Sequence, residues 1–311
     1  MLDVKRLRVL REVAARGSFS GAAESLSYTQ SAISQQIAAL EREAGTILVE
    51  RSARGVRLTE AGAALVRHAE AILSRLDAAE RELEAIAGLR GGRLRMVAFL
   101  SAAASLMPLA IAEFRRRYPA VELSLEPREP PEGIDCLKAG ECDVALGLES
   151  SFQPVVDDAV EKTMLLDDPM FLVLPCDHPL ARKPDLRLAD LADESWLQGD
   201  TATCPDTMIL LRAATAAGFE PRIAFQSNDY TATQGFIAAG VGVGLIPDLA
   251  LASVRDDIVI RDIGDQAPSR RIYAASLAGS YRAPATAAML EILEEVGRDY
   301  ERGRRKLALA S

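Results

Sequence analysis

A short stretch near the amino terminus combines many hydrogen-bonding side chains with little charge. In residues 30–44, Ile33, Ile37 and Leu40 recur at helical spacing and share one face. The opposite face carries amides, hydroxyls and small groups: Gln30, Ser31, Ser34, Gln35, Ala38 and Arg42. A solvent-facing helix normally carries Lys and Glu instead. Amides and hydroxyls can approach base edges in a DNA major groove, so this pattern predicts a DNA-reading helix.

Two shorter segments are expected to position that helix. Residues 2–15 have inward-facing apolar residues at helical spacing and predict a first helix that ends at Gly17. Ser18 is expected to cap a second helix over 20–26, and Thr29 to cap the third. Two helices joined by a tight turn predict a helix-turn-helix.

A basic hairpin is predicted directly after the helices. Residues 46–58 contain two apolar runs around Ser-Ala-Arg-Gly, with Gly55 in the turn. Arg51, Arg54 and Arg57 gather at its tip, where they could meet phosphates or enter a minor groove. The alternative is a solvated basic turn. Beside a helix-turn-helix, a DNA-contacting wing is favoured.

Residues 59–87 predict one long helix with a narrow apolar seam. Its apolar residues alternate at spacings of four and three: Leu65, Ala69, Ile72, Leu76, Ala79, Leu83 and Ile86. The remaining positions are largely charged, which favours contact with a second chain over packing on the same domain. Paired recognition helices would then read a palindromic DNA site.

Charge is distributed unevenly along the 311 residues, whose net charge is −9. Residues 1–62 contain nine basic and seven acidic side chains, which leaves 27 basic and 38 acidic ones in the remainder. The acidic remainder would be repelled by phosphate, so DNA contact should be confined to the first segment.

Composition also limits location and redox chemistry. No apolar run reaches membrane-spanning length, and the amino terminus lacks the unbroken apolar core of a signal peptide, so a cytoplasmic protein is expected. The four cysteines form no CxxC pair and are expected to be reduced thiols: Cys136, Cys142, Cys176 and Cys204.

A glycine-rich hinge at 88–92 precedes a segment in which strand-like and helix-like runs alternate. This alternation predicts an α/β fold with mostly parallel sheets. Strands are expected at 93–99, 121–126, 143–148, 164–174 apart from 167–169, 196–197, 223–226, 244–246, 258–263 and 272–276. Helices are expected at 102–118, 133–139, 206–217, 230–239 and 284–300, with a loose tail over 301–311.

Five segments together resemble the LysR-type transcriptional regulators, in that family's order and over essentially the whole chain. They are AAESLSYTQSAISQQIAALERE with VERSARGVRLTEAG near the start, then LKAGECDVALG (137–147), CDHPLA (176–181) and FIAAGVGVGLIP (236–247). The resemblance implies a winged helix-turn-helix at 1–58, a dimerising linker helix at 59–88 and an effector domain at 89–303. The effector domain would be like periplasmic binding proteins, with subdomains 93–160 plus 269–300 and 161–268. The chain would cross between them near Glu161 and near Ala267.

The partners that this resemblance implies are an operator in double-stranded DNA, a small-molecule effector in the cleft, further copies of the chain and RNA polymerase. Dimers would assemble into tetramers. The implied DNA-contacting residues are Ser20, Thr29, Gln30, Ser31, Ser34, Gln35, Arg51, Arg54 and Arg57. Many relatives have Pro at the position of Ser31 and Arg at that of Gln35. A Gln–adenine contact could therefore replace an Arg–guanine contact.

The implied effector site lies at the carboxyl ends of strands. A hydroxyl and free backbone N–H groups at Ser101, Ala102 and Ala103 would open a helix and attract an anion such as a carboxylate. The facing loops contribute Arg128, Gln198, Thr201, Thr203 and Asn228. Each of these loop residues could instead cap a helix.

Other chemistries are weighed and set aside. The two histidines, His68 and His178, have no catalytic neighbourhood, and HExxH, GxSxG and P-loop motifs are absent. No enzyme, metal or cofactor is expected, and the acid pairs at 167–168 and 256–257 are interpreted as solvated turns. The alternatives are a solute-binding protein, which residues 93–300 alone would fit, and redox sensing at Cys204, whose pKa a nearby helix terminus could lower.

Overall fold

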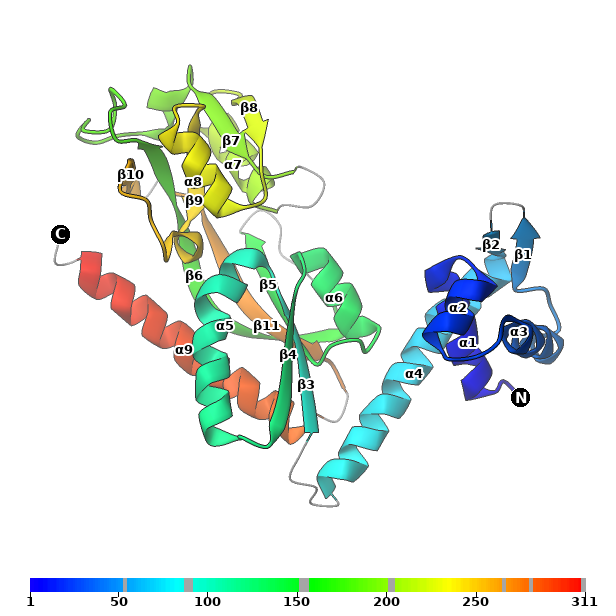
Figure 1. Cartoon of the computed structure of the whole chain (residues 1–311). Helices are drawn as coiled ribbons and strands as arrows, with labels where there is room; N and C mark the ends of the chain where they lie inside the picture. Colours follow the sequence, from blue (N-terminus) through cyan, green and yellow to red (C-terminus); the bar gives the residue numbers. More distant parts are fainter. Residues whose placement is uncertain are drawn as a thin grey trace. The chain divides into compact units, whose positions relative to one another are not determined.

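The chain folds into two compact units, one ending at Gly88 and the other beginning at Leu89. The computed structural model describes residues 1–52, 55–86, 92–150, 157–200, 205–264, 267–279 and 282–308. Figure 1 labels the helices and strands of both units. Within those described ranges, no helix is both long and apolar enough to cross a membrane.

The first unit is a three-helix bundle with a hairpin and a long helix. Its elements are α1 (Val4–Arg16), α2 (Phe19–Ser25), α3 (Gln30–Ala44), β1 (Val49–Ser52), β2 (Gly55–Leu58) and α4 (Glu60–Ile86). The predicted caps are confirmed. Gly17 adopts a left-handed φ of 62° after α1, and the side chains of Ser18 and Thr29 accept from the backbone N–H groups of Gly21 and Ala32.

The three helices close over one apolar core, which the start of α4 completes. The predicted inward face of α3 is buried there, together with apolar residues of α1: Leu7, Leu10, Val13, Ile33, Ile37 and Leu40. Ala69 of α4 belongs to the same core. Gly62 allows α4 to begin against this core, because a Cβ there would lie 2.0 Å from the carbonyl oxygen of Leu48.

The second unit alternates strands and helices as predicted. Its strands are β3 (Gly92–Ala98), β4 (Val121–Pro127), β5 (Val144–Ser150), β6 (Val160–Pro175), β7 (Ser195–Gln198), β8 (Arg222–Gln226), β9 (Val243–Pro247), β10 (Ile258–Arg261) and β11 (Ser269–Leu277). Its helices are α5 (Leu100–Arg117), α6 (Pro130–Lys138), α7 (Pro205–Ala216), α8 (Tyr230–Ala238) and α9 (Pro284–Ala308), with short turns η1 (Leu188–Leu191) and η2 (Asp248–Leu251).

The described strands of this unit form one sheet in the order β4-β3-β5-β11-β6-β9-β7-β8, with β10 also pairing β6. Pairing is parallel where β3 meets β4 and β5, and where β7 meets β8 and β9. It is antiparallel wherever β6 or β11 takes part. The prediction of mostly parallel sheets was therefore wrong, because the two central strands run against their neighbours.

The two central strands join the halves of the sheet. Residues 160–169 of β6 pair with β11, and residues 170–175 pair with β9 and β10. The strand thus passes from the first half to the second at Pro169–Met170, beyond the position near Glu161 that the sequence suggested. Asp167 and Asp168, predicted to form a solvated turn, lie inside this continuous strand and pair with Arg271 and Arg270.

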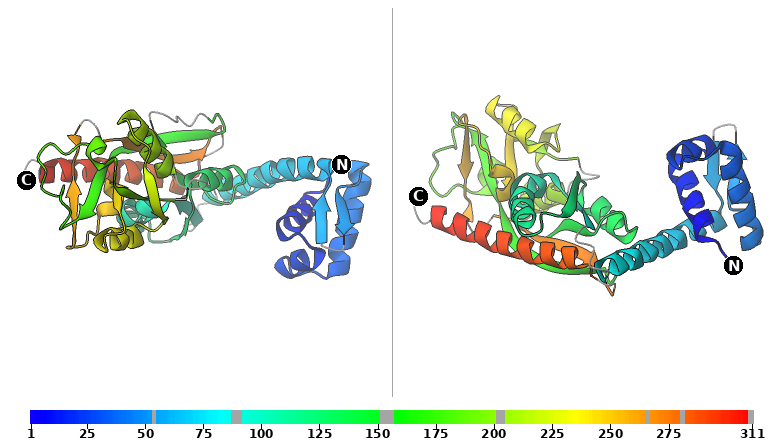
Figure 2. Two further views of the ribbon diagram at one scale, coloured as in Figure 1. Left: turned by 90° about the horizontal axis from the view of Figure 1, so that it is seen from above. Right: turned by 60° about the horizontal axis from the view of Figure 1, so that its bottom comes forward.

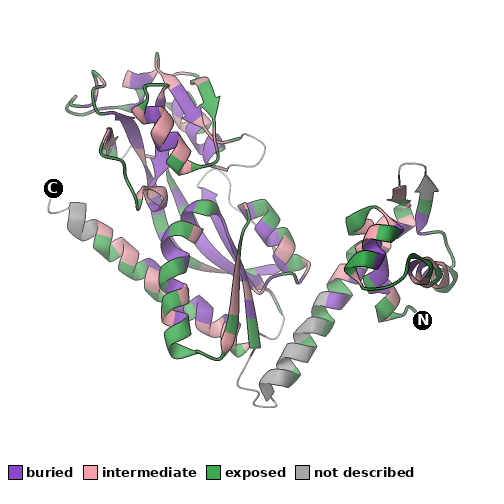
Figure 3. Cartoon of the chain, viewed as in Figure 1, coloured by how far each residue is buried: buried purple, intermediate pink, exposed green. Residues whose placement is uncertain are grey.

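Helices cover both halves of the sheet. In the first half, α5 and α9 pack over β3, β5 and β11 around a core that includes Phe114 and Leu293, while α6 covers the opposite face. In the second half, α7 and α8 enclose β7 and β9, where Trp196 is fully buried. Figure 3 shows that burial concentrates in the central strands of this unit.

The last helix is longer than predicted. Figure 2 shows α9 running as one helix to the end of the described chain. Residues 301–308 were expected to be loose, but they continue the helix. Glu301 accepts a hydrogen bond from the backbone N–H of Asp167, and Arg304 donates to the carbonyl oxygen of the same residue. These contacts with β6 hold the terminal turns.

Candidate functional sites

The outward face of α3 presents the predicted polar set. The side chains of Gln30, Ser31 and Gln35 are exposed, and Ser34 is half-buried. Thr29 is exposed but already engaged, since its hydroxyl accepts from the backbone N–H of Ala32 at 3.2 Å. The face therefore offers two amides and at least one hydroxyl to a partner that fits against the helix.

Contacts from α1 fix the orientation of α3. The Arg6 guanidinium donates to Gln36 at 3.2 Å and forms an ion pair with Glu43. These residues lie beside the exposed polar face and were not predicted from the sequence. They hold the helix by charge-assisted bonds at two positions about two turns apart.

The hairpin carries the predicted basic residues only partly within the described structure. Its pairing is antiparallel, with Glu50 opposite Arg57. The Arg57 side chain is exposed on β2, and Ser20 is exposed on α2. The side chain of Arg51 and the whole of Arg54 lie outside the described residues. The backbone is that of the predicted wing.

The apolar seam of α4 divides into two parts. Ala69 is fully buried in the core of the first unit. Farther along, Ile72 is 42% exposed, Leu76 39% and Leu83 66%. Apolar side chains in a row at heptad spacing and open to solvent are typical of a helix that pairs with another helix.

A buried guanidinium lies where the central strands pass between the halves of the sheet. Arg270 of β11 is 1% exposed, and all three of its nitrogens have acceptors. Its Nε lies 2.8 Å from Oδ2 of Asp168, its Nη1 lies 2.8 Å from Oδ2 of Asp206, and its Nη2 lies 2.6 Å from Oγ of Ser101. Its guanidinium also lies over the ring of Phe99, 5.2 Å from the centroid.

This Arg270 cluster joins elements from both halves of the unit. Asp168 belongs to β6 and accepts from the backbone N–H of Leu249 at 3.0 Å, while Asp206 opens α7. The hydroxyl of Tyr230, at the start of α8, donates to Asp206 Oδ2. Asp168 is thus a buried ion-pair partner.

The cluster contains more negative than positive charge. Asp168 and Asp206 are buried around the single guanidinium of Arg270. Glu129 lies within electrostatic reach: burial, followed by repulsion from Asp206, raises the pKa of its carboxyl, and Arg270 opposes the rise. An isolated negative charge is costly in such surroundings, so the group favours a further proton or a cation.

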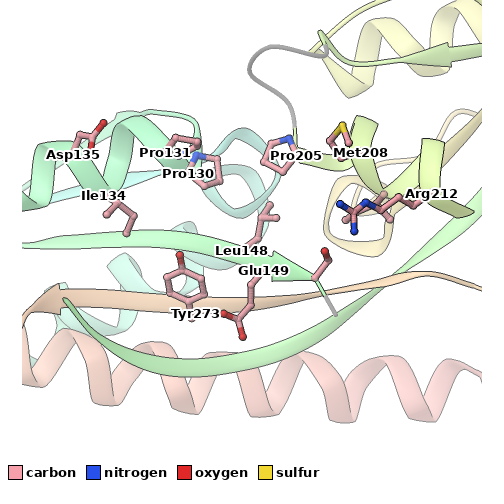
Figure 4. A pocket seen from close by; sticks show the side chains of 12 residues that line it. Pro130, Pro131, Ile134, Asp135, Leu148, Glu149, Pro205, Met208, Arg212 and Tyr273 are labelled. Atoms are coloured by element: carbon pink, nitrogen blue, oxygen red, sulfur yellow. The ribbon is translucent and has the colours of Figure 1, made fainter. Parts of the chain in front are cut away.

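A pocket of about 260 Å³ opens between α6, the strands β5 and β11, and α7. Figure 4 shows Pro130 and Pro131 of α6 across from Pro205 and Met208 of α7, with the Tyr273 hydroxyl directed toward the pocket from below. The lining is mainly apolar. Glu149 also lines the pocket, but its carboxylate forms ion pairs with Lys162 and Arg271. The pocket suits a small, partly apolar ligand.

The predicted effector residues do not gather in one place. Ser101 joins the Arg270 cluster, and its neighbours Ala102 and Ala103 are buried and half-buried. Gln198 and Asn228 line a second, smaller pocket. The larger pocket's lining includes none of the predicted set. Arg128 is exposed and paired with Glu126, and Thr201 and Thr203 lie outside the described residues.

Sequence reasoning missed the residues that matter most to this geometry. Arg270 and Asp206 were not singled out, and Asp168 was interpreted as part of a turn. Two adjacent acids at 167–168 and two adjacent arginines at 270–271, just before the strand predicted at 272–276, gave a weak signal. An acid inside a predicted apolar strand could have indicated a buried ion pair, because an unpaired charge is rarely tolerated there.

Other reactive side chains form no cluster in the described structure. Cys142 is buried, Cys136 half-buried and Cys176 exposed, and none of these three is in a disulfide; Cys204 lies outside the described residues. His178 lies 3.3 Å from Glu194. Among the described residues, no group of three or more His, Cys, Asp or Glu is arranged to hold a metal ion.

A helix-turn-helix unit followed by an α/β unit with a pocket between its halves defines a DNA-binding, ligand-responsive transcription regulator. Comparison with known families supports this class. Residues 4–63 match the bacterial regulatory helix-turn-helix proteins of the lysR family, and residues 87–298 match the LysR substrate-binding domain. The chain belongs to the LysR family of transcriptional regulators.

Relatives and solved structures agree with this assignment. The probable transcriptional regulator LrrA of Synechococcus elongatus is 30% identical, covering 94% of this chain and 97% of that protein. The dual regulator GltC of Bacillus subtilis is 29% identical, covering 84% and 85%. A full-length OxyR variant of Pseudomonas aeruginosa has the same fold (TM-score 0.72, 24% identity, 96% and 95% covered). So does full-length CbnR solved with its target DNA (TM-score 0.67, 24% identity, 95% and 100% covered).

Proposed function

We propose that the protein is a homo-oligomeric repressor or activator that reads a palindromic operator with α3 and responds to a small effector. The observation that carries the proposal is the exposed, nearly uncharged polar face of α3, held by capped helix ends. Gln30, Ser31, Ser34 and Gln35 would contact base edges, and Arg57, with Arg51 and Arg54, the phosphates or the minor groove. Ser20 and Thr29 would contact the sugar-phosphate backbone of the DNA.

Pairing of two chains through α4 would bring two such faces to the two halves of an operator. Exposed Ile72, Leu76 and Leu83 support this arrangement. Assembly of dimers into tetramers, contact with RNA polymerase and action in the cytoplasm belong to the same proposal. They rest on the family alone.

The effector would bind where the halves of the second unit meet, in the region bounded by the Arg270 cluster, the larger pocket and the smaller pocket. Ser101 belongs to that cluster, whereas Gln198 and Asn228 line the adjoining smaller pocket. Binding there would change how the halves close on each other and so the spacing of the two DNA-binding units in a paired molecule. The ligand would be bound and released unchanged, without catalysis. A solute-binding protein is not favoured, because the chain carries the family's DNA-binding unit.

The DNA-reading role is tested by binding to the DNA upstream of the protein's own coding sequence. Gln35→Ala is expected to lower affinity for that DNA about tenfold or more, because an amide paired with a base contributes roughly 1–3 kcal/mol. Binding to unrelated DNA should change little. Gln226→Ala, which removes an exposed amide on β8, is the matched control. Equal losses on both DNAs, or none, would contradict base reading by α3.

A further inference from the structure

Two buried acceptors, one at the end of β7 and one in the first turn of α7, lack hydrogen-bond donors among the described residues. Oδ2 of Asp206 receives Arg270 and Tyr230, but its Oδ1 is buried without a hydrogen-bond partner. Oε1 of Gln198 is in the same state. Both residues line the smaller pocket, of about 30 Å³, at the carboxyl ends of β7, β8 and β9. A buried acceptor without a donor is costly, so a donor is expected in this pocket.

The charge around the pocket points to a positive donor. Asp168 and Asp206 share the one guanidinium of Arg270, and Glu129 adds a third carboxyl within electrostatic reach. A water molecule would fit the volume and satisfy the two acceptors, but it would leave the excess negative charge uncompensated.

An anionic ligand fits this environment poorly. Arg270 is already bound by two buried carboxylates, so a further carboxylate would add to the excess negative charge. A metal ion fits poorly as well, because no three or more His, Cys, Asp or Glu side chains of the described residues are arranged to hold one. A protonated amine carries a positive charge and three N–H donors in a compact group, and it meets both requirements.

We propose that the effector of this regulator carries a protonated primary amine, which donates to Oδ1 of Asp206 and Oε1 of Gln198 in the smaller pocket. This inference rests on the proposed function, since it names the chemical class of the effector. It differs from the carboxylate that the helix terminus at Ser101 suggested. The hydroxyl in the first turn of α5 is that of Ser101, and it already accepts a hydrogen bond from Arg270. The acidic excess therefore decides the sign of the ligand.

The test uses the full-length protein and thermal unfolding with paired compounds. The amines are butylamine, 2-phenylethylamine and 1,4-diaminobutane; each is paired with the alcohol of the same skeleton, and butyrate and phenylacetate complete the set. At least one amine is expected to raise the Tm in a concentration-dependent manner, while its paired alcohol and the carboxylates do not.

Three variants locate the effect. Asp206→Asn should weaken binding of the amine about tenfold or more, because a charge-assisted hydrogen bond is lost. Gln198→Leu should also weaken amine binding. This variant keeps the Arg270–Asp206 ion pair, so it still tests the inference if Asp206→Asn fails to fold. Asp256→Asn, on an exposed turn before β10, is the matched control and should bind as the wild type does.

Several outcomes would overturn the inference. They are an alcohol or carboxylate that stabilises as well as the paired amine, no stabilisation by any amine, and unchanged amine binding in both Asp206→Asn and Gln198→Leu. In the first case the effector-responsive function stands and only the ligand class fails. If DNA binding through α3 also fails in the operator assay, the proposed function itself fails, so the two results are distinguishable.

Discussion

At the scale of single residues, Arg270 determines the chemistry at the point where β6 and β11 pass between the halves of the second unit. Its side chain is fully buried and neutralises one of the two carboxylates that it contacts, Asp168 and Asp206, while Ser101 receives its third nitrogen. Such a group cannot be removed singly, because its partners would stay buried without a counter-charge.

Arg270→Met is expected to lower the free energy of unfolding by about 3–5 kcal/mol, because two buried carboxylates lose their partner. Urea denaturation measures this. The double variant Arg270→Met with Asp168→Asn should recover part of the loss. A loss below about 1 kcal/mol would show that the two acids are solvated when Arg270 is absent, contrary to the burial described.

Gly147 is required by the ring of Tyr273. A Cβ at this position would lie 2.4 Å from Cζ of that ring, so Gly147→Ala is expected to destabilise the protein by about 1–3 kcal/mol through overpacking. Gly235→Ala in α8 is the control, since nothing lies within 4 Å of its Cβ position. Denaturation midpoints that fall equally in both variants would contradict the ring contact as the cause.

The Tyr273 hydroxyl gives a pH dependence with a defined sign. Burial, then the nearby carboxylates of Glu149 and Asp157, raises its pKa to about 12. The unfolded tyrosine ionises near its ordinary pKa of about 10, so folding stability is full below pH 10 and falls between about pH 10 and 12. Tyr273→Phe should show a shallower fall in unfolding free energy over this range. Tyr118→Phe, an exposed control, should match the wild type.

At the scale of elements, the two long helices α4 and α9 differ in how much of their length is packed. The first turns of α4 complete the core of the amino-terminal unit through Ala69, and the later turns leave Ile72, Leu76 and Leu83 exposed. In contrast, α9 is held along its length, from the core at Leu293 to the contacts of Glu301 and Arg304 with β6.

The exposed part of the α4 seam predicts an oligomerisation defect without a folding defect. Leu76→Asp with Leu83→Asp should shift the protein toward monomers in light scattering, because two charges would be buried between paired helices. Ala71→Asp, an exposed position outside the seam, should leave the mass unchanged. If the double variant keeps the wild-type mass, α4 does not pair the chains.

At the scale of the whole molecule, charge is distributed unevenly along the chain. The first 62 residues have a slight basic excess, and the remainder has 11 more acidic than basic residues. Binding to DNA should therefore depend on salt only through the few arginines of residues 1–62, since the acidic remainder is repelled by phosphate.

This division predicts how salt affects DNA binding. Arg57→Ala should reduce the slope of log affinity against log salt by about one, because one phosphate contact releases about one counterion. Arg115→Ala, which removes an exposed arginine of α5, should leave the slope unchanged. Equal changes in the two variants would place phosphate contact outside the hairpin.

The sequence alone determined the elements and the family. Caps at Gly17, Ser18 and Thr29 depend on local backbone geometry, and the buried face of α3 depends on helical spacing, so both could be predicted from residues close together in the chain. The segments that carry the family resemblance are likewise local. The exposed face of α3 followed from the same periodicity.

The tertiary structure decided the site. Ser101, Asp168 and Asp206 lie 169, 102 and 64 positions from Arg270, so no local pattern relates them. Only the passage of β6 and β11 between the halves of the sheet brings them together. The same long-range pairing made a strand of Asp167–Pro169, and contacts of Glu301 and Arg304 with that strand hold the last turns of α9. The tertiary structure also produced the excess of negative charge at the Arg270 cluster, because it places two carboxylates around one guanidinium.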